Sequence, residues 1–152
     1  MLCWTDVAAQ DPELMEKGHN MLFQHGIGLA YLATVDASNA PRLHPIVVVH
    51  LDSGLYTFLI PSPKQRDLEH NPGYALHAYS SAESDNEFAL RGVVRRVDDE
   101  TIRAAVIDAA QHGVAPEHDL YEFLISSALL AEYEYRGHWP PAYSIWNAAA
   151  GG

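Results

Sequence analysis

The first stretch with a clear hydrophobic period is DPELMEKGHNMLFQHG, residues 11–26. Its apolar side chains recur at the three- and four-residue intervals of an amphipathic helix. Asp11 suits the capping position, Pro12 suits the first helical position, and Gly26 is expected to end the helix. The face expected to be buried carries Leu14, Met21, Leu22 and His25.

The middle of the chain has the hydrophobic pattern of β-strands. Strands are predicted over residues 28–36, 41–51, 55–60, 73–79 and 87–97. The second strand alternates cleanly, with one face made of Leu43, Pro45, Val47, Val49 and Leu51 and the other of Arg42, His44, Ile46, Val48 and His50. The turn DSG that follows is a three-residue hairpin loop, with Gly54 free to adopt a positive φ.

The C-terminal part predicts a second helix and further strands. The helix is expected over residues 98–112, followed by Gly113, with a buried stripe of Ile102, Ala105, Val106 and Ala109. Residues 119–137 fit a helix or a strand, and their Tyr, Phe and Ile content favours a strand. Residues 142–146 are predicted as a last strand. Strands joined by hairpins, with helices at the ends, predict an antiparallel β-barrel in one α+β domain that spans the whole chain, residues 1–152.

Composition narrows the class of protein. The formal net charge is -11, with 20 acidic against 9 basic residues, which disfavours nucleic acids and anionic membranes as partners. No apolar run reaches the roughly 18 residues of a membrane helix, and no positive charge of a secretory signal precedes Lys17. The one cysteine, Cys3, cannot form an internal disulfide. We therefore expect a soluble cytoplasmic protein.

The segment SPKQRDLEHNP, residues 62–72, predicts a short helix with an unusual charge at its start. Ser62 can cap it, Pro63 suits its first position, and Gln65 can be the reciprocal partner of a capping box. The free N–H groups and partial positive charge of a helix N-terminus favour a bound anion. Lys64 adds a full positive charge there, which opposes the helix dipole unless an anion such as phosphate binds. The alternative is a solvated lysine on a capped surface helix.

Arg42 and His44 extend this basic region. They share one face of their strand, and the predicted hairpin places that strand beside the one that leads into Ser62. Together with Lys64 they are expected to form a basic pocket. The alternative is that Arg42 is a surface residue near a strand end and that His44 is hydrogen-bonded within the sheet.

Other motifs indicate little chemistry. The sequence has no H-E-x-x-H or C-x-x-C, so no metal site is expected. It has no G-x-S-x-G, Walker A loop or G-x-G-x-x-G, and no catalytic residue is assigned. Ser126 and Ser127 lie in an apolar stretch, and Arg95 and Arg96 are interpreted as a solvated strand end.

The order of these features resembles a known family. The segment APRLHPIVVVHLDSGLYTFLIPSPKQRDLEHNP is similar to the pyridoxamine 5'-phosphate oxidase-like, FMN-binding split-barrel family. The shared features are a hairpin ending in an aromatic-Thr strand, then S-x-K, then a short helix closed by N-P. EFALRGVVRRVDDE continues the similarity as a strand with a central glycine that passes into an acidic turn and a helix. The C-terminal third resembles the family more weakly.

The resemblance implies a mainly β, six-stranded antiparallel split β-barrel with flanking helices, and a homodimer with flavin at its interface. It places Lys64 on the flavin phosphate, Thr57 at the border of the flavin, and Glu87 where many members have a glutamine that reaches the flavin from the other subunit. The positions that it implies for cofactor binding are Arg42, His44, Thr57, Ser62, Lys64, Gln65 and Glu87. A dimer is also expected because strand edges and three aromatic residues need cover, namely Tyr79, Trp139 and Trp146.

The sequence departs from the family pattern at three positions in or beside the expected cofactor site. Pro63 stands where the oxidase proper has a second basic residue, His44 replaces an arginine, and Glu87 replaces an amide donor. A neutral histidine is a weaker phosphate partner. The arginine and histidine pair that binds pyridoxal phosphate is not recognisable. The resemblance therefore implies a flavin-type site more strongly than it implies pyridoxamine phosphate oxidation.

The function predicted from the sequence is an FMN-dependent oxidoreductase that acts on a small molecule of unidentified class. The first alternative is an F420-dependent reductase. Others are a non-catalytic flavin- or haem-binding protein on the same barrel, and an interaction module without a cofactor. Haem is not expected as the native cofactor, because none of the candidate axial ligands has a recognisable ligand context: His77, His112 and His138.

Overall fold

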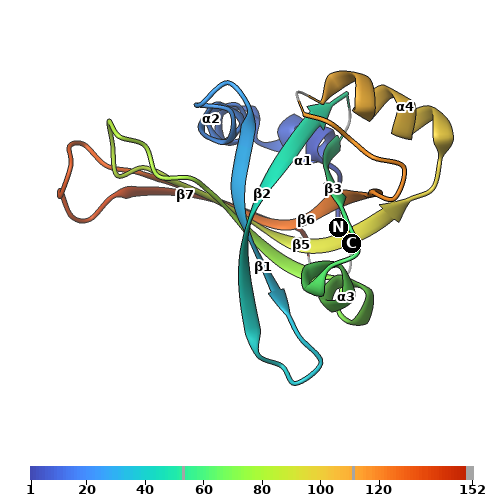
Figure 1. The fold of residues 1–152 in the computed structure, drawn as a ribbon. Coiled ribbons are helices and arrows are strands. Elements are labelled where there is room, and N and C mark those ends of the chain that lie inside the picture. Colours follow the sequence, from blue (N-terminus) through green and yellow to red (C-terminus); the bar gives the residue numbers. More distant parts are fainter. Residues whose placement is uncertain (53, 111, 150–152) are drawn as a thin grey trace.

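The computed structural model describes residues 1–52, 54–110 and 112–149 and shows a β-barrel with flanking helices (Figure 1). The helices are α1 Trp4–Gln10, α2 Pro12–Leu22, α3 Pro63–His70 and α4 Glu100–Ala109. The strands are β1 Gly28–Val35, β2 Pro41–Leu51, β3 Gly54–Leu59, β4 Gly73–Ala78, β5 Glu87–Val97, β6 Asp119–Glu132 and β7 Ala142–Asn147. Within the described ranges, no helix is both long enough and apolar enough to cross a membrane.

Six strands close the barrel in the order β3-β2-β1-β4-β5-β6, because β3 pairs with β6 as well as with β2. Every pairing is antiparallel. The seventh strand, β7, pairs with the second half of β6 and extends the sheet away from the barrel (Figure 1). The predicted six-stranded antiparallel barrel in an α+β chain is confirmed, and the ambiguous segment after Asp119 is a strand.

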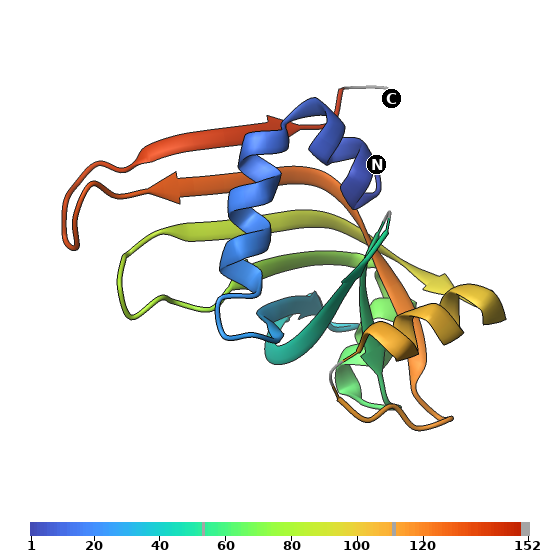
Figure 2. The ribbon, with the colours of Figure 1, turned by 90° about the horizontal axis from the view of Figure 1, so that it is seen from above.

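The core lies between the inner face of the sheet and α2. One register row crosses five strands with side chains that are all buried: Leu32, Leu76, Leu90, Ala128 and Trp146. Figure 2 shows α2 crossing this face. The helix can lie this close because Gly18 rests on the ring of Phe88, where a Cβ atom would be only 2.2 Å from the ring. Asp11 caps α2 as predicted by accepting a hydrogen bond from the backbone N–H of Leu14.

Helix α4 buries a different face from the one that its sequence predicts. Val106 is its one buried side chain and joins a small second core with Val49, Tyr56 and Leu120, whereas Ile102 is 38% exposed. Arg103 of this helix adds two contacts: it lies over the ring of Phe58, 5.4 Å from its centroid, and it donates to the carbonyl of His118. The predicted helix also included Gln111, which lies outside the described residues.

Three other details differ from the prediction. The sequence pattern missed α1, whose only buried anchors are Trp4 and Val7. Helix α2 ends at Leu22 rather than near Gly26, so His25 is exposed. In the β2–β3 turn, positive φ occurs at Asp52 (φ 47). Gly54 belongs to β3, and the ring of Tyr56 occupies the space of a Cβ there, 2.6 Å away. Ser53, in the same predicted turn, lies outside the described residues.

The N-terminal helices enclose a pair of histidines. The ring of His50 on β2 lies 4.9 Å from the ring of His19 on α2 and 5.4 Å from that of Trp4. The Nε2 atom of His50 is buried without a hydrogen-bond partner among the described residues. Burial lowers the pKa of both histidines, and the neighbouring His19 lowers that of His50 further, with Asp52 opposing it. The folded state therefore favours the neutral form of both rings.

We expect this pair to make the fold sensitive to acid. The unfolded chain takes up protons near pH 6.5, the ordinary value for histidine, and the folded chain only at lower pH. Stability should therefore fall as the pH drops below about 6.5, by at most about 1.4 kcal/mol per pH unit for each histidine, less where solvent screens the rings. His50→Phe should flatten this dependence. Urea unfolding between pH 7.5 and pH 5 measures it, and equal slopes for both proteins would contradict the assignment.

Candidate functional site

The barrel is split between β2 and β3. These strands pair only beside their hairpin, through Val49–Tyr56, His50–Leu55 and Leu51–Gly54. Beyond Tyr56, β3 turns to β6 and leaves β2. The buried hydroxyl of Thr57 spans the separating strands and donates to the carbonyl of Val47 at 2.9 Å. The split leaves a hollow of about 210 Å³ against the start of α3.

Lys64 reaches this hollow from the first turn of α3. Ser62 caps the helix, and its hydroxyl accepts from the backbone N–H of Gln65 at 3.4 Å, as predicted. The hollow is lined by Pro45, Ile46, Val47, Phe58, Leu59, Ile60, Lys64, His112 and His118. The Lys64 side chain therefore lies where apolar strand edges meet the free N–H groups of a helix start.

Lys64 is also one of the few basic side chains without a partner. Most of the lysines and arginines hold a carboxylate or a carbonyl. Across the described ranges, the side chains of Lys64, Arg66 and Arg91 form no ion pair or hydrogen bond. In a chain with 20 acidic and 9 basic residues, an unpaired cation is free for an external anion.

Gln65 does not complete the predicted capping box. Its side-chain amide is buried and donates to Asp119 at 2.6 Å and to the hydroxyl of Tyr121 at 3.1 Å. The amide therefore fastens α3 to β6 instead of returning to the backbone of Ser62. The assignment of Gln65 to a cofactor site stays a prediction.

Arg42 fastens α3 on its other side. Its Nε atom donates to the buried carboxylate of Asp67 at 2.8 Å, and the hydroxyl of Thr34 donates to the same oxygen at 2.7 Å. Burial by itself raises the pKa of Asp67, but the hydrogen bonds from Arg42 and Thr34 outweigh it and hold the pKa below its ordinary value. Arg42 therefore orients the helix that carries Lys64, and its charge is largely matched by Asp67.

His44 lies within this network as a neutral ring. Its Nε2 atom is 3.3 Å from the hydroxyl of Thr34. Because that hydroxyl gives its single proton to Asp67, it can only accept from His44, which places the imidazole proton on Nε2. Burial, then the charges of Lys64 and Arg42, lower the pKa of His44. The structure thus brings Arg42, His44 and Lys64 together. Lys64 is the one whose positive charge is left unpaired, because Arg42 is paired with Asp67 and the surroundings of His44 favour its neutral form.

Glu87 lies elsewhere, at the start of β5. Its carboxylate is 3.6 Å from Nε2 of His77 on β4, and both side chains are nearly half exposed. None of the contacts that hold α3 includes Glu87. The predicted role of Glu87 therefore depends on a second subunit.

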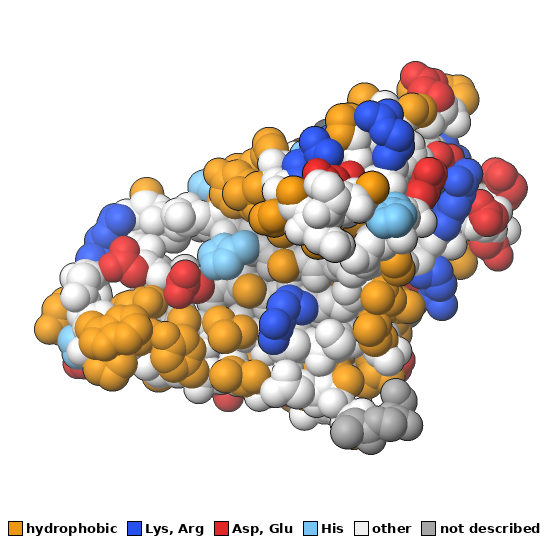
Figure 3. All heavy atoms as spheres, turned by 90° about the horizontal axis from the view of Figure 1, so that it is seen from below, with side chains coloured by type: hydrophobic (Ala, Val, Ile, Leu, Met, Phe, Trp, Pro, Cys, Tyr) orange, Lys and Arg blue, Asp and Glu red, His pale blue; other side chains and the backbone are white. Residues whose placement is uncertain are grey.

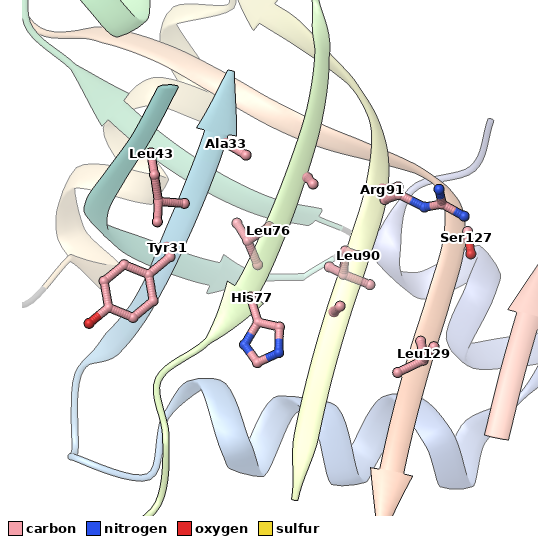
Figure 4. Close-up of a pocket in the computed structure, with 11 residues that line it drawn as sticks. Tyr31, Ala33, Leu43, Leu76, His77, Leu90, Arg91, Ser127 and Leu129 are labelled. Atoms are coloured by element: carbon pink, nitrogen blue, oxygen red, sulfur yellow. The ribbon is translucent and has the colours of Figure 1, made fainter. Parts of the chain in front are cut away.

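The outward face of the sheet carries a groove that the sequence analysis missed. One register row across it reads Tyr31, His77, Ala89, Leu129 and Ile145. The next reads Leu43, Ala33, Ala75, Arg91 and Ser127. The small side chains of the three alanines leave a hollow of about 240 Å³ (Figure 4). The alternation of Glu87, Ala89 and Arg91 along β5 was the available signal.

The histidines considered as haem ligands are scattered. His77 lines the groove, His112 lines the hollow beside Lys64, and His138 lies near Tyr135 in the β6–β7 connection. The Nδ1 atoms of His112 and His138 are buried without a partner within the described part of the chain. A search of the described residues finds no cluster of three or more His, Cys, Asp or Glu side chains that could hold a metal ion.

No protein-family model matches the sequence, and no curated protein does either. Solved structures do match the fold. A haem-binding protein from Mycobacterium smegmatis is 17% identical with a TM-score of 0.63, over 84% of this chain and 56% of that one. This chain thus spans little more than half the length of the mycobacterial protein.

In two further matches, the alignment covers nearly the whole length of the other protein. A NimC/NimA family protein from Clostridium acetobutylicum is 15% identical with a TM-score of 0.62, over 86% of this chain and 91% of that one. A candidate pyridoxamine 5'-phosphate oxidase from Listeria innocua is 21% identical with a TM-score of 0.61, over 76% and 96%. At these identities the likeness shows the fold. The split barrel implied by the resemblance is confirmed.

The charge of Lys64 should be measurable at His44. We expect the His44 ring to titrate below the ordinary value of 6.5 and Lys64→Gln to raise its pKa only in part, because burial is the larger cause. NMR titration of the imidazole measures both values. Arg66→Gln is the control, since it removes a positive charge from the exposed side of the same helix. A His44 pKa that is the same in wild type and Lys64→Gln would show that the two groups are not close.

Proposed function

We propose that the chain is a cytoplasmic, homodimeric oxidoreductase that binds FMN and acts on a small molecule. The observation that carries this proposal is the unpaired Lys64 ammonium in the first turn of a capped helix, at the mouth of a largely apolar hollow. A phosphate is the anion that suits such a position best, because it accepts from backbone N–H groups and from a lysine at once.

The remaining residues suit a cofactor of this kind. Arg42 and Asp67 hold the helix, so the N–H groups and Lys64 are fixed before a phosphate arrives. Pro45 and Val47 line the hollow beside Lys64 and offer an apolar surface to a planar ring. When bound, the flavin would supply the hydride chemistry. The protein would hold the phosphate, cover the ring and exclude water. F420 would use the same lysine.

Two fold neighbours support a redox cofactor, without distinguishing flavin from haem. One neighbour is a candidate pyridoxamine 5'-phosphate oxidase and another is a haem-binding protein. Absorbance spectra of the purified chain, recorded after separate additions of FMN, F420 and haem, distinguish the three candidate cofactors. Flavin-like spectral change favours the proposal, whereas a stoichiometric Soret band that disappears on mutation of one histidine would replace it with haem binding.

A second copy would cover the outward face of the sheet. Hydrophobic side chains gather on this face (Figure 3). Leu43, Tyr143 and Ile145 are 67%, 52% and 57% exposed. Ile145 ends one of the two rows that form the groove, and Tyr143 lies on the adjoining row with Glu87 and Ala131. Apolar surface of this extent is typical of an interface between proteins. Trp146, expected among the residues that need cover, is already buried by its own chain, with its Nε1 donating to Gln10. Trp139 is 71% exposed.

Removal of the Lys64 charge should weaken binding of the phosphate selectively. A charge-assisted contact of about 1.5–3 kcal/mol corresponds to a loss of about 10- to 150-fold in FMN affinity for Lys64→Ala. Riboflavin, which lacks the phosphate, should bind wild type and variant alike. Fluorescence titration measures both affinities, with Arg66→Ala as the charge-matched control. If FMN and riboflavin lose affinity equally, or neither does, Lys64 is not a phosphate ligand.

The dimer should depend on the apolar outward face. We expect wild type to sediment as a dimer at micromolar concentration and Ile145→Asp to weaken it by at least about 2 kcal/mol, roughly 30-fold in Kd, because a carboxylate would be buried without a partner. Ile107→Asp is the matched control, since Ile107 is also exposed but lies on α4. A monomeric wild type, or equal effects of the two variants, would contradict the interface.

A further inference from the structure

We infer that the groove on the outward face binds a small, mainly apolar molecule that carries one anionic group, held by Arg91 and Ser127. The two side chains are direct register partners on β5 and β6 and lie side by side at one end of the groove (Figure 4). A guanidinium and a hydroxyl in this arrangement can both donate to a carboxylate, sulfonate or phosphate.

The Arg91 guanidinium is available for such a ligand. Its side chain has no ion pair or hydrogen bond with any described residue, although acids outnumber bases in the chain. Its neighbours in the register row are Ala75 and Ser127, neither of which carries a charge. Arg91 is exposed to solvent in the free chain. A ligand that fills the groove would displace the water around the guanidinium, so its own anionic group would have to balance that charge.

The backbone beside Arg91 contains a β-bulge. The β5–β6 register shifts between Arg91 and Gly92, so that Ser126 is an extra residue in β6. Its hydroxyl donates to the Arg91 carbonyl at 3.1 Å. Gly92 permits this bulge, because a Cβ atom there would be 1.9 Å from the carbonyl oxygen of Leu124. Bulges re-aim the side chains beside them and occur often at functional sites. Here the bulge sets the direction of Arg91 beside Ser127.

The rest of the groove suits an apolar body. Ala33, Ala75 and Ala89 leave depth in its floor, and Leu43 and Leu129 contribute aliphatic side chains. Tyr31 lines the far end and stacks on Tyr79, with their ring centroids 4.4 Å apart. An anion alone would not use these surfaces, and an uncharged molecule would not use Arg91. The combination selects an amphipathic acid.

This site is separate from the one proposed for the cofactor phosphate. It lies on β2, β1, β4, β5 and β6, whereas Lys64 lies at the start of α3. The inference does not require that the chain binds flavin. If a second copy covers the outward face, the groove becomes a hollow between the subunits, and the anion of the ligand balances Arg91 there.

Two fluorescent probes test the assignment on the full chain without cofactor. Anilinonaphthalene sulfonate carries an aromatic body and one anion, and phenylnaphthylamine is a similar aromatic amine without the anion. We expect Arg91→Gln to weaken the sulfonate by about 10-fold or more and the neutral probe by less than about twofold. Arg91→Lys should keep part of the sulfonate affinity, and Ser127→Ala should lose less than Arg91→Gln does. Arg66→Gln, which removes the exposed and unpaired arginine of α3, should change neither probe.

Each other result overturns the inference. It fails if the sulfonate does not bind wild type, if Arg91→Gln leaves its affinity within twofold, or if both probes weaken equally. Circular dichroism should show that Arg91→Gln folds, since no internal partner of Arg91 is lost. Sedimentation should show an unchanged oligomeric state, and conversion of a dimer to a monomer by Arg91→Gln would make Arg91 an interface contact instead. These measurements use the chain without cofactor, so they test the groove even if FMN does not bind at Lys64.

Discussion

The double pairing of β3 is the constraint on which the rest of the structure depends. Beside its hairpin β3 pairs with β2, and from Tyr56 onward it pairs with β6. The second pairing closes six of the seven strands into a barrel. The same change of partner separates β3 from β2 and opens the hollow beside Lys64. Barrel closure and the candidate cofactor site therefore have one cause.

The position of α3 follows from two buried polar anchors. Asp67 accepts from Arg42 and Thr34 on one side, and Gln65 donates to Asp119 and Tyr121 on the other. Both anchors involve side chains that would be costly to bury alone, so each needs its partners. The charge of Arg42, on β2, is paired with Asp67 of α3, whereas Lys64 of α3 stays unpaired among the described residues. Positioning and binding are thereby divided between different residues of one basic cluster.

The two faces of the sheet have opposite designs. The inner row is filled by leucines and a tryptophan that pack against α2, and the helix approaches closely over Gly18. The outer rows carry three alanines between larger side chains, so that this face is hollowed while remaining apolar. A large, contiguous apolar patch on a surface usually marks an interaction site. The apolar, hollowed exterior is the reason for proposing both a second subunit and a ligand on this side.

Local sequence determined a large part of this structure. The alternation in β2, the caps Asp11 and Ser62, and the prolines after them act within a few residues, and all were predictable. Together with the family resemblance they indicated the barrel and the lysine at the start of α3. The hydrophobic pattern was insufficient for β6, because residues 119–137 alternate too poorly to exclude a helix, and only their Tyr, Phe and Ile content favoured a strand.

Only the tertiary structure decided which side chains are free. Gln65 was a plausible capping partner until β6 brought Asp119 and Tyr121 within its reach, and the charge of Arg42 is matched because α3 brings Asp67 to it. Arg91 was not singled out in the sequence, because it is the uncharged residues beside it on β4 and β6 that leave it without a partner. The physical reason is common to all three. Hydrogen bonds and ion pairs act over a few ångströms, and pairing of distant strands determines which groups come within that range.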